Sequence, residues 1–218
     1  ETIEETMSGN IGFNRKTSVT IIRNGDLATN CYLKATVGAV TVALDDNDAP
    51  NGSVCWGRRL GHNLINNVTV SIGGSQIDKH WGTWMDLWYE LTHTQEQERG
   101  YNKMIGDVAE LTELRGLATV DQTADVVPAY TLYIPLQFWF CRNTGLALPL
   151  IALQYHEVRL WIQFNPFQDL IVYTNNLNLN RLGNGIGVFN DASLLVDYIY
   201  IDTEERRRFA QVGHEYLI

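Results

Sequence analysis

Apolar and polar residues alternate along much of the chain, with the two-residue period of strands that are buried on one face. The clearest run covers residues 132–140, where every second residue is apolar. Residues 158–164 repeat the pattern, and further β-rich runs occur at 19–22, 32–44 and 68–72, of which 32–44 is broken by Gly38. Each run predicts a strand, so we expect the chain to be all-β.

An apolar corner joins the strands predicted at 132–140 and 158–164. Residues 141–145 have the sequence CRNTG, which favours a turn. Residues 146–153 are almost entirely apolar and contain Pro149. We therefore expect two half-buried strands that are connected through a short apolar segment.

A helix is predicted to interrupt the strands, because large apolar residues recur at helical spacing. These residues are Trp81, Trp84, Met85, Trp88 and Tyr89. They occupy one helix face, so we expect their side chains to pack inward. Asp78 is the candidate N-cap. Asp86 and Glu90 lie one turn apart on the opposite face, where we expect solvent.

A second helix is predicted over residues 203–211. Asp202 and Glu205 have the spacing of a capping box, and three arginines, Arg206, Arg207 and Arg208, follow. Three basic residues beside Glu204 and Glu205 usually form a solvated face or ion pairs between subunits. We interpret this helix as a connector to another module.

Strands with isolated helical insertions favour an eight-stranded antiparallel jelly-roll sandwich. An immunoglobulin sandwich would have shorter loops and a Cys…Trp…Cys framework. Turn-rich inserts are expected at 45–52 and 175–187, where Asn, Asp and Gly are frequent. The glycines at 183–187 resemble a phosphate loop, but no amphipathic helix follows them, so a turn is the better interpretation.

Composition narrows the possible partners. The 218 residues are 45 % hydrophobic and 19 % charged, which is typical of a globular domain. A formal charge of -9 argues against a main role in gripping nucleic acid. No apolar run reaches the roughly 18 residues of a membrane span, and the acidic start is unlike a targeting peptide. We expect a soluble intracellular product with no membrane insertion.

The three cysteines, Cys31, Cys55 and Cys141, lack metal-ligand spacing and are predicted to be free thiols in a reducing compartment. No initiating Met is present and the sequence stops at Ile218, so we expect a piece of a longer polypeptide.

No catalytic or metal signature is visible. The five histidines have no HxH, HExxH or i,i+4 pairing. Cys141 could be a nucleophile and His156 with Glu157 a base and its orienting partner, but neither lies in a known local motif. We predict a non-enzyme without a metal or cofactor. The alternative is a carbohydrate-binding or glycoside-processing β-sandwich with Asp86 and Glu90 as paired acids. A cupin-like enzyme would need clustered His and Glu ligands that this sequence does not display.

Two N-x-S/T sequons are candidate glycosylation sites, at Asn51 and Asn67. Asn51 lies in a predicted turn, which leaves it sterically open. Asn67 lies on the polar face of a predicted strand, where a glycan or a neighbouring subunit would fit.

Several segments, in order, resemble one protein family. They include FNRK at 13–16, IRNGDL at 22–27, IGG at 72–74, residues 84–92, LQFWFCRN at 136–143, LPLIAL at 148–153, VDYIY at 196–200 and HEYLI at 214–218. In this order and spacing the chain resembles the major capsid proteins of the nucleocytoplasmic large DNA viruses. The resemblance implies an N-terminal jelly roll over residues 1–202. It also implies a connector helix over 203–218 that leads to a second jelly roll.

The resemblance further implies a structural role and location. Three full-length copies would form a pseudo-hexameric capsomer, and capsomers would tile an icosahedral shell in the virion, assembled in the host cytoplasm. The implied partners are other copies and minor capsid proteins. The residues we expect at assembly contacts are Trp139, Trp161, Asn143, Pro149, Arg206, Arg207 and Arg208. The family's segment before the position of Glu1 has no counterpart in this sequence.

Overall fold

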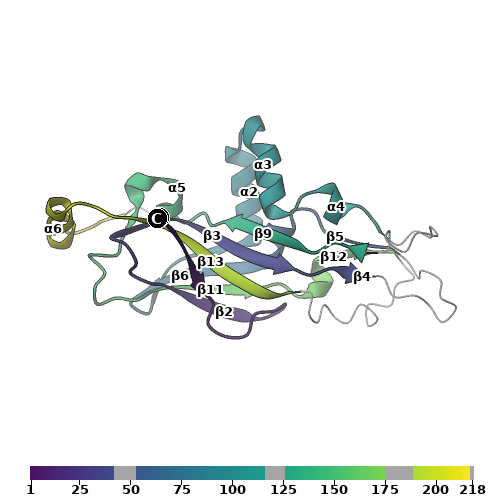
Figure 1. The fold of residues 1–218 in the computed structure, drawn as a ribbon, viewed down its shortest axis with the longest axis horizontal. Helices are drawn as coiled ribbons and strands as arrows, with labels where there is room; N and C mark the ends of the chain where they lie inside the picture. Colours follow the sequence, from purple (N-terminus) through teal and green to yellow (C-terminus); the bar gives the residue numbers. More distant parts are fainter. Residues whose placement is uncertain (42–52, 116–125, 175–188, 217–218) are drawn as a thin grey trace.

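The computed structural model describes residues 1–41, 53–115, 126–174 and 189–216 (Figure 1). Two antiparallel sheets form the body. The first contains β1 (Thr2–Thr6), β13 (Phe189–Ile199), β3 (Leu27–Val37) and β10 (Leu148–Pro149) in that order, with β9 (Tyr130–Pro135) also paired to β3. The second has the order β2 (Lys16–Ile21), β11 (Val158–Phe164), β6 (Ile65–Ile72) and β7 (Ser75–Trp81).

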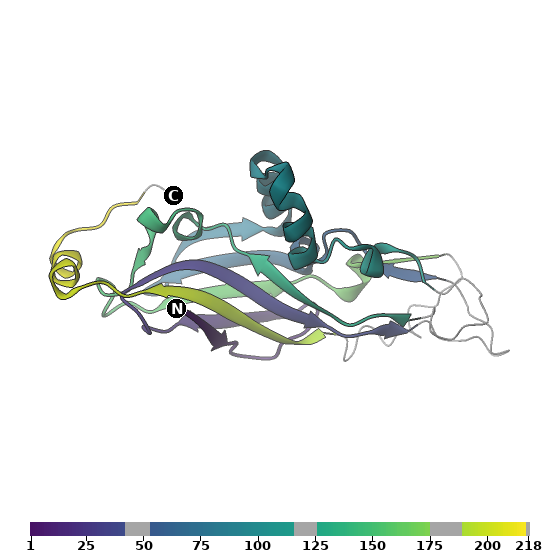
Figure 2. The ribbon, with the colours of Figure 1, turned by 45° about the horizontal axis from the view of Figure 1, so that its top comes forward.

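Shorter elements surround these sheets. Two strand pairs join β12 (Ile171–Tyr173) to β5 (Val54–Trp56) and β4 (Val40–Thr41) to β8 (Val126–Val127). The helices are α1 (Leu60–Leu64), α2 (Gly82–Thr92), α3 (Gln95–Ile105), α4 (Ala109–Thr112), α5 (Trp139–Arg142) and α6 (Thr203–Gln211), with single 3₁₀ turns η2 (Thr144–Leu146) and η3 (Phe167–Asp169). In Figures 1 and 2, α2 and α3 project from the body as a hairpin, and α6 stands at one end.

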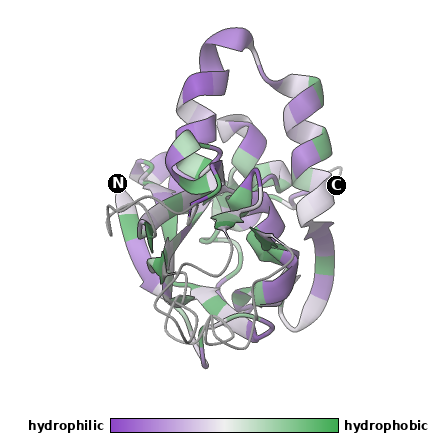
Figure 3. Ribbon diagram, turned by 90° about the vertical axis from the view of Figure 1, so that its right-hand side faces the viewer, coloured by the Kyte–Doolittle hydropathy of each residue, from purple (hydrophilic) through white to green (hydrophobic). Residues whose placement is uncertain are grey.

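The core lies between the two sheets and follows the predicted alternation. In β11, Val158, Leu160, Ile162 and Phe164 are at most 2 % exposed, while the residues between them are half-buried. β2, β3 and β6 confirm the runs predicted at 19–22, 32–44 and 68–72 as far as the structure describes them. In β6 the polar residues that alternate with the core residues, Asn67, Thr69 and Ser71, are buried as well, so this strand is covered on both faces. Figure 3, viewed from the end of the molecule, shows both kinds of residue along the ribbon.

The strand predicted at 132–140 is too long. β9 ends at Pro135, and residues 139–142 form the single turn α5. Phe138, Trp139 and Phe140 are all buried, whereas an extended chain would direct Trp139 to the opposite face from its two neighbours. The helical turn therefore replaces the end of the strand because three consecutive aromatic side chains all enter the core.

The predicted helix at the tryptophans is confirmed as α2, but its start and its faces differ from the prediction. Trp81, not Asp78, is the N-cap residue, because Asp78 lies in β7 and accepts the amide of Lys79. Met85 and Tyr89 are buried, whereas Trp81 is 51 % exposed. Packing at the helix start needs Gly82: an added Cβ would lie 2.3 Å from a carbonyl oxygen of α1.

Helix α3 was not predicted from the sequence. Its interior is mostly polar and has only one buried residue, Ile105, so no strong apolar period marks it. The available signal is the capping box of Thr94 and Gln97 at its start and Gly106, with φ 78°, at its end. The inserts predicted at 45–52 and the glycines at 183–187 lie outside the described residues.

Candidate assembly surfaces

The outer face of the β2-β11-β6-β7 sheet presents one tryptophan near its centre. Register places Trp161 of β11 opposite Ser18 of β2 and Thr69 of β6. Lys16 lies 5.0 Å and Arg159 5.5 Å from the centre of the Trp161 ring. Both cations are thus within reach of cation–π attraction to the indole, which is half-buried.

The β7 edge extends this face. Trp81 pairs with Asn67 across the sheet, and Lys79 lies 5.1 Å from its ring. At the other end, Arg159 donates to both carboxylate oxygens of Glu157, at 2.8 and 2.9 Å. This bond, together with one from a threonine, lowers the pKa of Glu157. The residues of this sheet that face away from the core form what we call the outer sheet face: Lys16, Ser18, Thr20, Asn67, Thr69, Ser71, Lys79, Trp81, Arg159, Trp161 and Gln163.

The second surface surrounds the apolar corner at residues 141–153. The residues predicted to make contacts there differ in exposure. Asn143 is exposed and its side chain accepts the amide of Gly145 at 2.8 Å, which stabilises η2. Pro149 is buried and pairs with Leu27 in β10. Trp139, expected at an assembly contact, is only 5 % exposed and packs edge-on to Phe140, so its side chain lies in the core and not on the surface.

Helix α6 is attached to the sandwich by a few polar bonds. Asp202 accepts the amides of Glu204 and Glu205, which confirms it as the N-cap. Asp26 accepts from Ile201 and, at 2.9 Å, from Arg206. Burial alone would raise the pKa of Asp26, but these donors and the arginine charge outweigh burial and lower it. The Arg206 side chain is therefore already paired within this chain, with Asp26.

The other two arginines differ from Arg206. Arg207 and Arg208 are exposed, and α6 buries none of its residues. Beyond the helix the chain returns to the corner, where Tyr216 donates to the carbonyl oxygen of Ala147 at 3.1 Å and lies 6.4 Å from Trp139 between ring centres. Exposed arginines on a helix that projects from the body are available to a neighbour.

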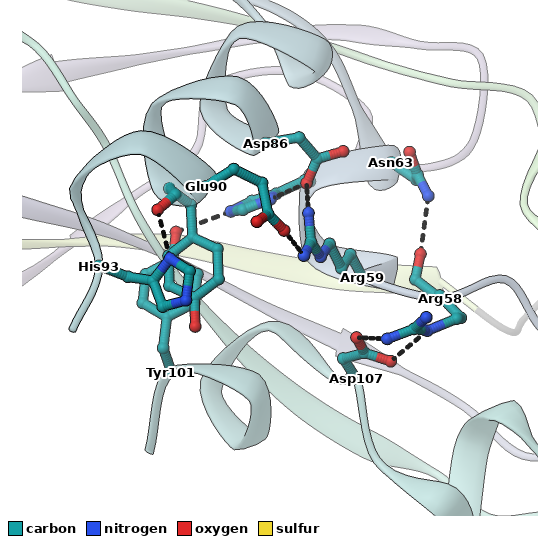
Figure 4. Close-up of polar contacts among 10 residues, drawn as sticks. Arg58, Arg59, Asn63, Asp86, Glu90, His93, Tyr101 and Asp107 are labelled. Atoms are coloured by element: carbon teal, nitrogen blue, oxygen red, sulfur yellow. Dashed lines mark hydrogen bonds and ion pairs between the residues drawn. The ribbon is translucent and has the colours of Figure 1, made fainter. Parts of the chain in front are cut away.

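A buried polar network joins α1 to the α2–α3 hairpin (Figure 4). His62 of α1 is fully buried; its Nδ1 contacts Asp86 of α2 and its Nε2 lies 2.7 Å from the hydroxyl of Tyr101 of α3. Arg59 forms ion pairs with Asp86 and Glu90. Burial raises the pKa of Tyr101, so its hydroxyl remains a donor.

This network changes the expected setting of the two acids. Both were expected to face solvent, or to act as paired acids in the alternative function. Glu90 does face solvent, with a side chain that is 50 % exposed, whereas Asp86 is half-buried, and both are bound to Arg59. Asp86 also contacts the fully buried His62. Tyr89 and Tyr101 stack at 4.1 Å between ring centres beside them. The arrangement holds three helices together and offers no free acid pair.

The two sequons have different outcomes. Asn51 lies outside the described residues. Asn67 is 8 % exposed, and its Nδ2 donates to Asn66 and Gln163. A glycan at Nδ2 would displace both hydrogen bonds and the surrounding sheet side chains, so the observed conformation of Asn67 does not suit this modification.

Metal-ligand groups and membrane-spanning helices are the two further kinds of site relevant to the described residues. Within the described ranges, no group of three or more His, Cys, Asp or Glu side chains is arranged to hold a metal ion. No helix in the same ranges is both long and apolar enough to cross a bilayer. The three cysteines have free thiols.

Two antiparallel sheets that enclose one core, with a projecting helical hairpin, are the architecture of a jelly-roll protein. Residues 1–202 match the family described as "Major capsid protein N-terminus". The chain therefore belongs to the major capsid proteins of large DNA viruses.

Individual relatives agree with this family. Capsid protein 1 of Acanthamoeba polyphaga mimivirus is 44 % identical over all of this chain and 36 % of its own length. The major capsid protein of Pyramimonas orientalis virus is 46 % identical over all of this chain and 48 % of its own. The chain thus spans less than half the length of these relatives.

Solved structures confirm the antiparallel jelly-roll fold. The PBCV-1 virus capsid matches with a TM-score of 0.73 and 33 % identity, covering 99 % of this chain and 45 % of that one. The Faustovirus major capsid protein matches with a TM-score of 0.74 over 96 % and 55 % of the two chains. At 12 % identity, the second match shows the fold alone.

Proposed function

We propose that this chain is the N-terminal jelly roll of a major capsid protein that assembles as trimers into the icosahedral shell of a virion. Each full-length copy would contribute two jelly rolls to a pseudo-hexameric capsomer. Its partners would be other copies and minor capsid proteins, without direct contact to nucleic acid or insertion into a membrane. Assembly would take place in the host cytoplasm. The family match over residues 1–202 is the observation that supports this most strongly.

The physical basis is a rigid body with flat sides. Four strands about 4.8 Å apart, each about seven residues long at 3.3 Å per residue, give the outer sheet face an area of roughly 440 Å². Permanent interfaces bury more than about 2,000 Å² in total, so this face is one contact among several. A half-buried tryptophan within cation–π reach of two cations suits the centre of such a contact.

The test uses the full-length protein with Trp161→Ala and, as a matched control, Tyr155→Ala. Tyr155 is 93 % exposed on a turn outside the outer sheet face. Trp161→Ala should weaken trimer or shell formation at least tenfold in the concentration required, measured by light scattering and electron microscopy. Tyr155→Ala should assemble normally. Equal assembly of both variants would remove the outer sheet face from the proposal.

The connector is tested separately. Arg207→Glu with Arg208→Glu reverses charges that are exposed in this chain, whereas Arg206→Glu also breaks the ion pair with Asp26. We expect the double variant to fold normally and to assemble poorly. Unchanged shells from the double variant would exclude the two arginines from assembly. Monomers whose melting temperature rises with added sugar would instead support the carbohydrate-binding alternative.

A further inference from the structure

Two of the three thiols meet at one backbone oxygen. Cys31 lies in β3 and Cys141 in α5, and contacts between these two elements bring the residues together. The Sγ of Cys31 lies 3.7 Å from the carbonyl oxygen of Thr29, and the Sγ of Cys141 lies 3.6 Å from the same oxygen. The two sulfurs are therefore neighbours, although the residues are far apart in the sequence.

The two thiols differ in access. Cys31 is 1 % exposed, while Cys141 is partly exposed. The contact with Cys141, followed by burial, raises the pKa of Cys31. A reagent in solution will therefore reach Cys141 first, and Cys31 is placed to react only with what forms on Cys141. This order is the one required of an attacking cysteine and its resolving partner.

The third thiol provides an internal reference. Cys55 lies in β5, is 4 % exposed, and has a pKa raised by burial. It donates no hydrogen bond to the carbonyl that Cys31 and Cys141 share. A reaction that depends on the pairing should spare Cys55, whereas a reaction that depends only on the presence of a thiol should not.

We propose that Cys31 and Cys141 form an oxidation site that closes to an intramolecular disulfide in the presence of a small disulfide oxidant such as oxidised glutathione. The Cys141 thiol gives its proton to water, and its thiolate attacks one glutathione sulfur, which releases one glutathione thiolate. The Cys31 thiol then loses its proton, and its sulfur attacks Cys141 and releases the second glutathione. Two protein thiols are oxidised and one oxidised glutathione is reduced, so the reaction balances.

The bond would fasten α5 to β3 beside the corner surface. Both sulfurs must turn from the Thr29 oxygen toward each other to reach the S–S length of about 2.05 Å. A cross-link that closes a loop of roughly 110 residues restricts the unfolded chain strongly. The time at which the disulfide forms rests on the proposed function. The thiols stay reduced during assembly inside the cell, and the disulfide forms after release into oxidising surroundings. The chemistry itself does not depend on assembly.

The experiment treats the full-length protein with oxidised glutathione and then maps peptides without reduction. We expect a linked pair of peptides containing Cys31 and Cys141, loss of two hydrogens from the intact mass, and a Tm increase of about 5–15 °C that reductant reverses. Cys55→Ser should behave like the native protein. Cys31→Ser should retain glutathione on Cys141, because the resolving thiol is missing.

Two results would overturn the proposal. One is stable glutathione on Cys141 in the native protein; the other is a link that involves Cys55 as often as Cys31. Should Cys31→Ser fail to fold, peptide mapping of the native protein and Cys55→Ser still decides between these results. Failure of the trimer experiments would leave the mapped disulfide unaffected, so the two proposals are tested independently.

Discussion

Removal of one hydroxyl group tests the buried network at the base of the α2–α3 hairpin. Tyr101→Phe deletes the group that lies 2.7 Å from Nε2 of His62 and leaves the ring to stack on Tyr89. Nδ1 of the same ring contacts Asp86, so the hydroxyl is the second polar partner of His62. His62 has no exposed surface, so water does not readily replace the lost partner.

The magnitude follows from that burial. A buried donor or acceptor left without a partner costs about 1–3 kcal/mol. For a domain of this size, each kcal/mol lowers Tm by roughly 2–4 °C. We therefore expect Tyr101→Phe to lose about 1–3 kcal/mol of unfolding free energy in urea. Amides of α3 should also exchange faster with deuterium, because α3 loses its bond to α1.

Tyr130→Phe is the matched control. The Tyr130 hydroxyl also donates to α3, to the carbonyl oxygen of Lys103 at 2.7 Å, but at an exposed position where water can take its place. Its loss should change stability by no more than about 0.5 kcal/mol. Equal effects of the two substitutions in urea and in hydrogen exchange would refute the argument that burial of His62 makes its hydrogen bond valuable.

Three further predictions concern other positions. Gly82→Ala should lower the free energy of unfolding by more than about 3 kcal/mol, because its Cβ would lie 2.3 Å from a backbone oxygen. Gly100→Ala, which has open space around it in α3, should raise the free energy of unfolding by about 0.5–1 kcal/mol. Urea titrations that rank the two variants the other way would contradict this. Burial lowers the pKa of His80, so the folded state favours the neutral ring. The contribution of His80 to the free energy of unfolding should be complete above about pH 6.5 and should decline below it. In His80→Gln the urea midpoint should therefore change less between pH 7.5 and 5.5 than in the native protein. Asp202→Ala should weaken α6 by about 1 kcal/mol through loss of its cap, seen as faster amide exchange at Glu204 and Glu205 without a change in global Tm, since α6 buries no residue.

Local patterns predicted the elements whose environment is regular. Alternation identified β11 and β6, because the apolar residues of each strand share the face that enters the core and polar or amphipathic residues lie between them. Helical spacing identified α2, and the Asp202 cap identified α6, because a cap acts on amides two and three residues away. In these cases the information lies within one short stretch of chain.

Elements with uniform surroundings were predicted poorly. Phe138, Trp139 and Phe140 all face the core, so their sequence contains no period to separate a strand from a helical turn. α3 has the opposite problem, since its polar surface on a projecting hairpin lacks an apolar stripe. Whether each of these segments forms a strand or a helix depends on the parts of the fold that pack against it.

The amino-acid sequence by itself determined the two-faced strands, the helix caps and, through the order of its segments, the family. Tertiary structure alone decided which distant groups meet: His62 with Asp86, Arg206 with Asp26, and Cys31 with Cys141. The reason is physical. Hydrophobic period and capping are properties of neighbouring residues, whereas these pairs depend on sheet register and helix packing, which are set only when the whole core closes.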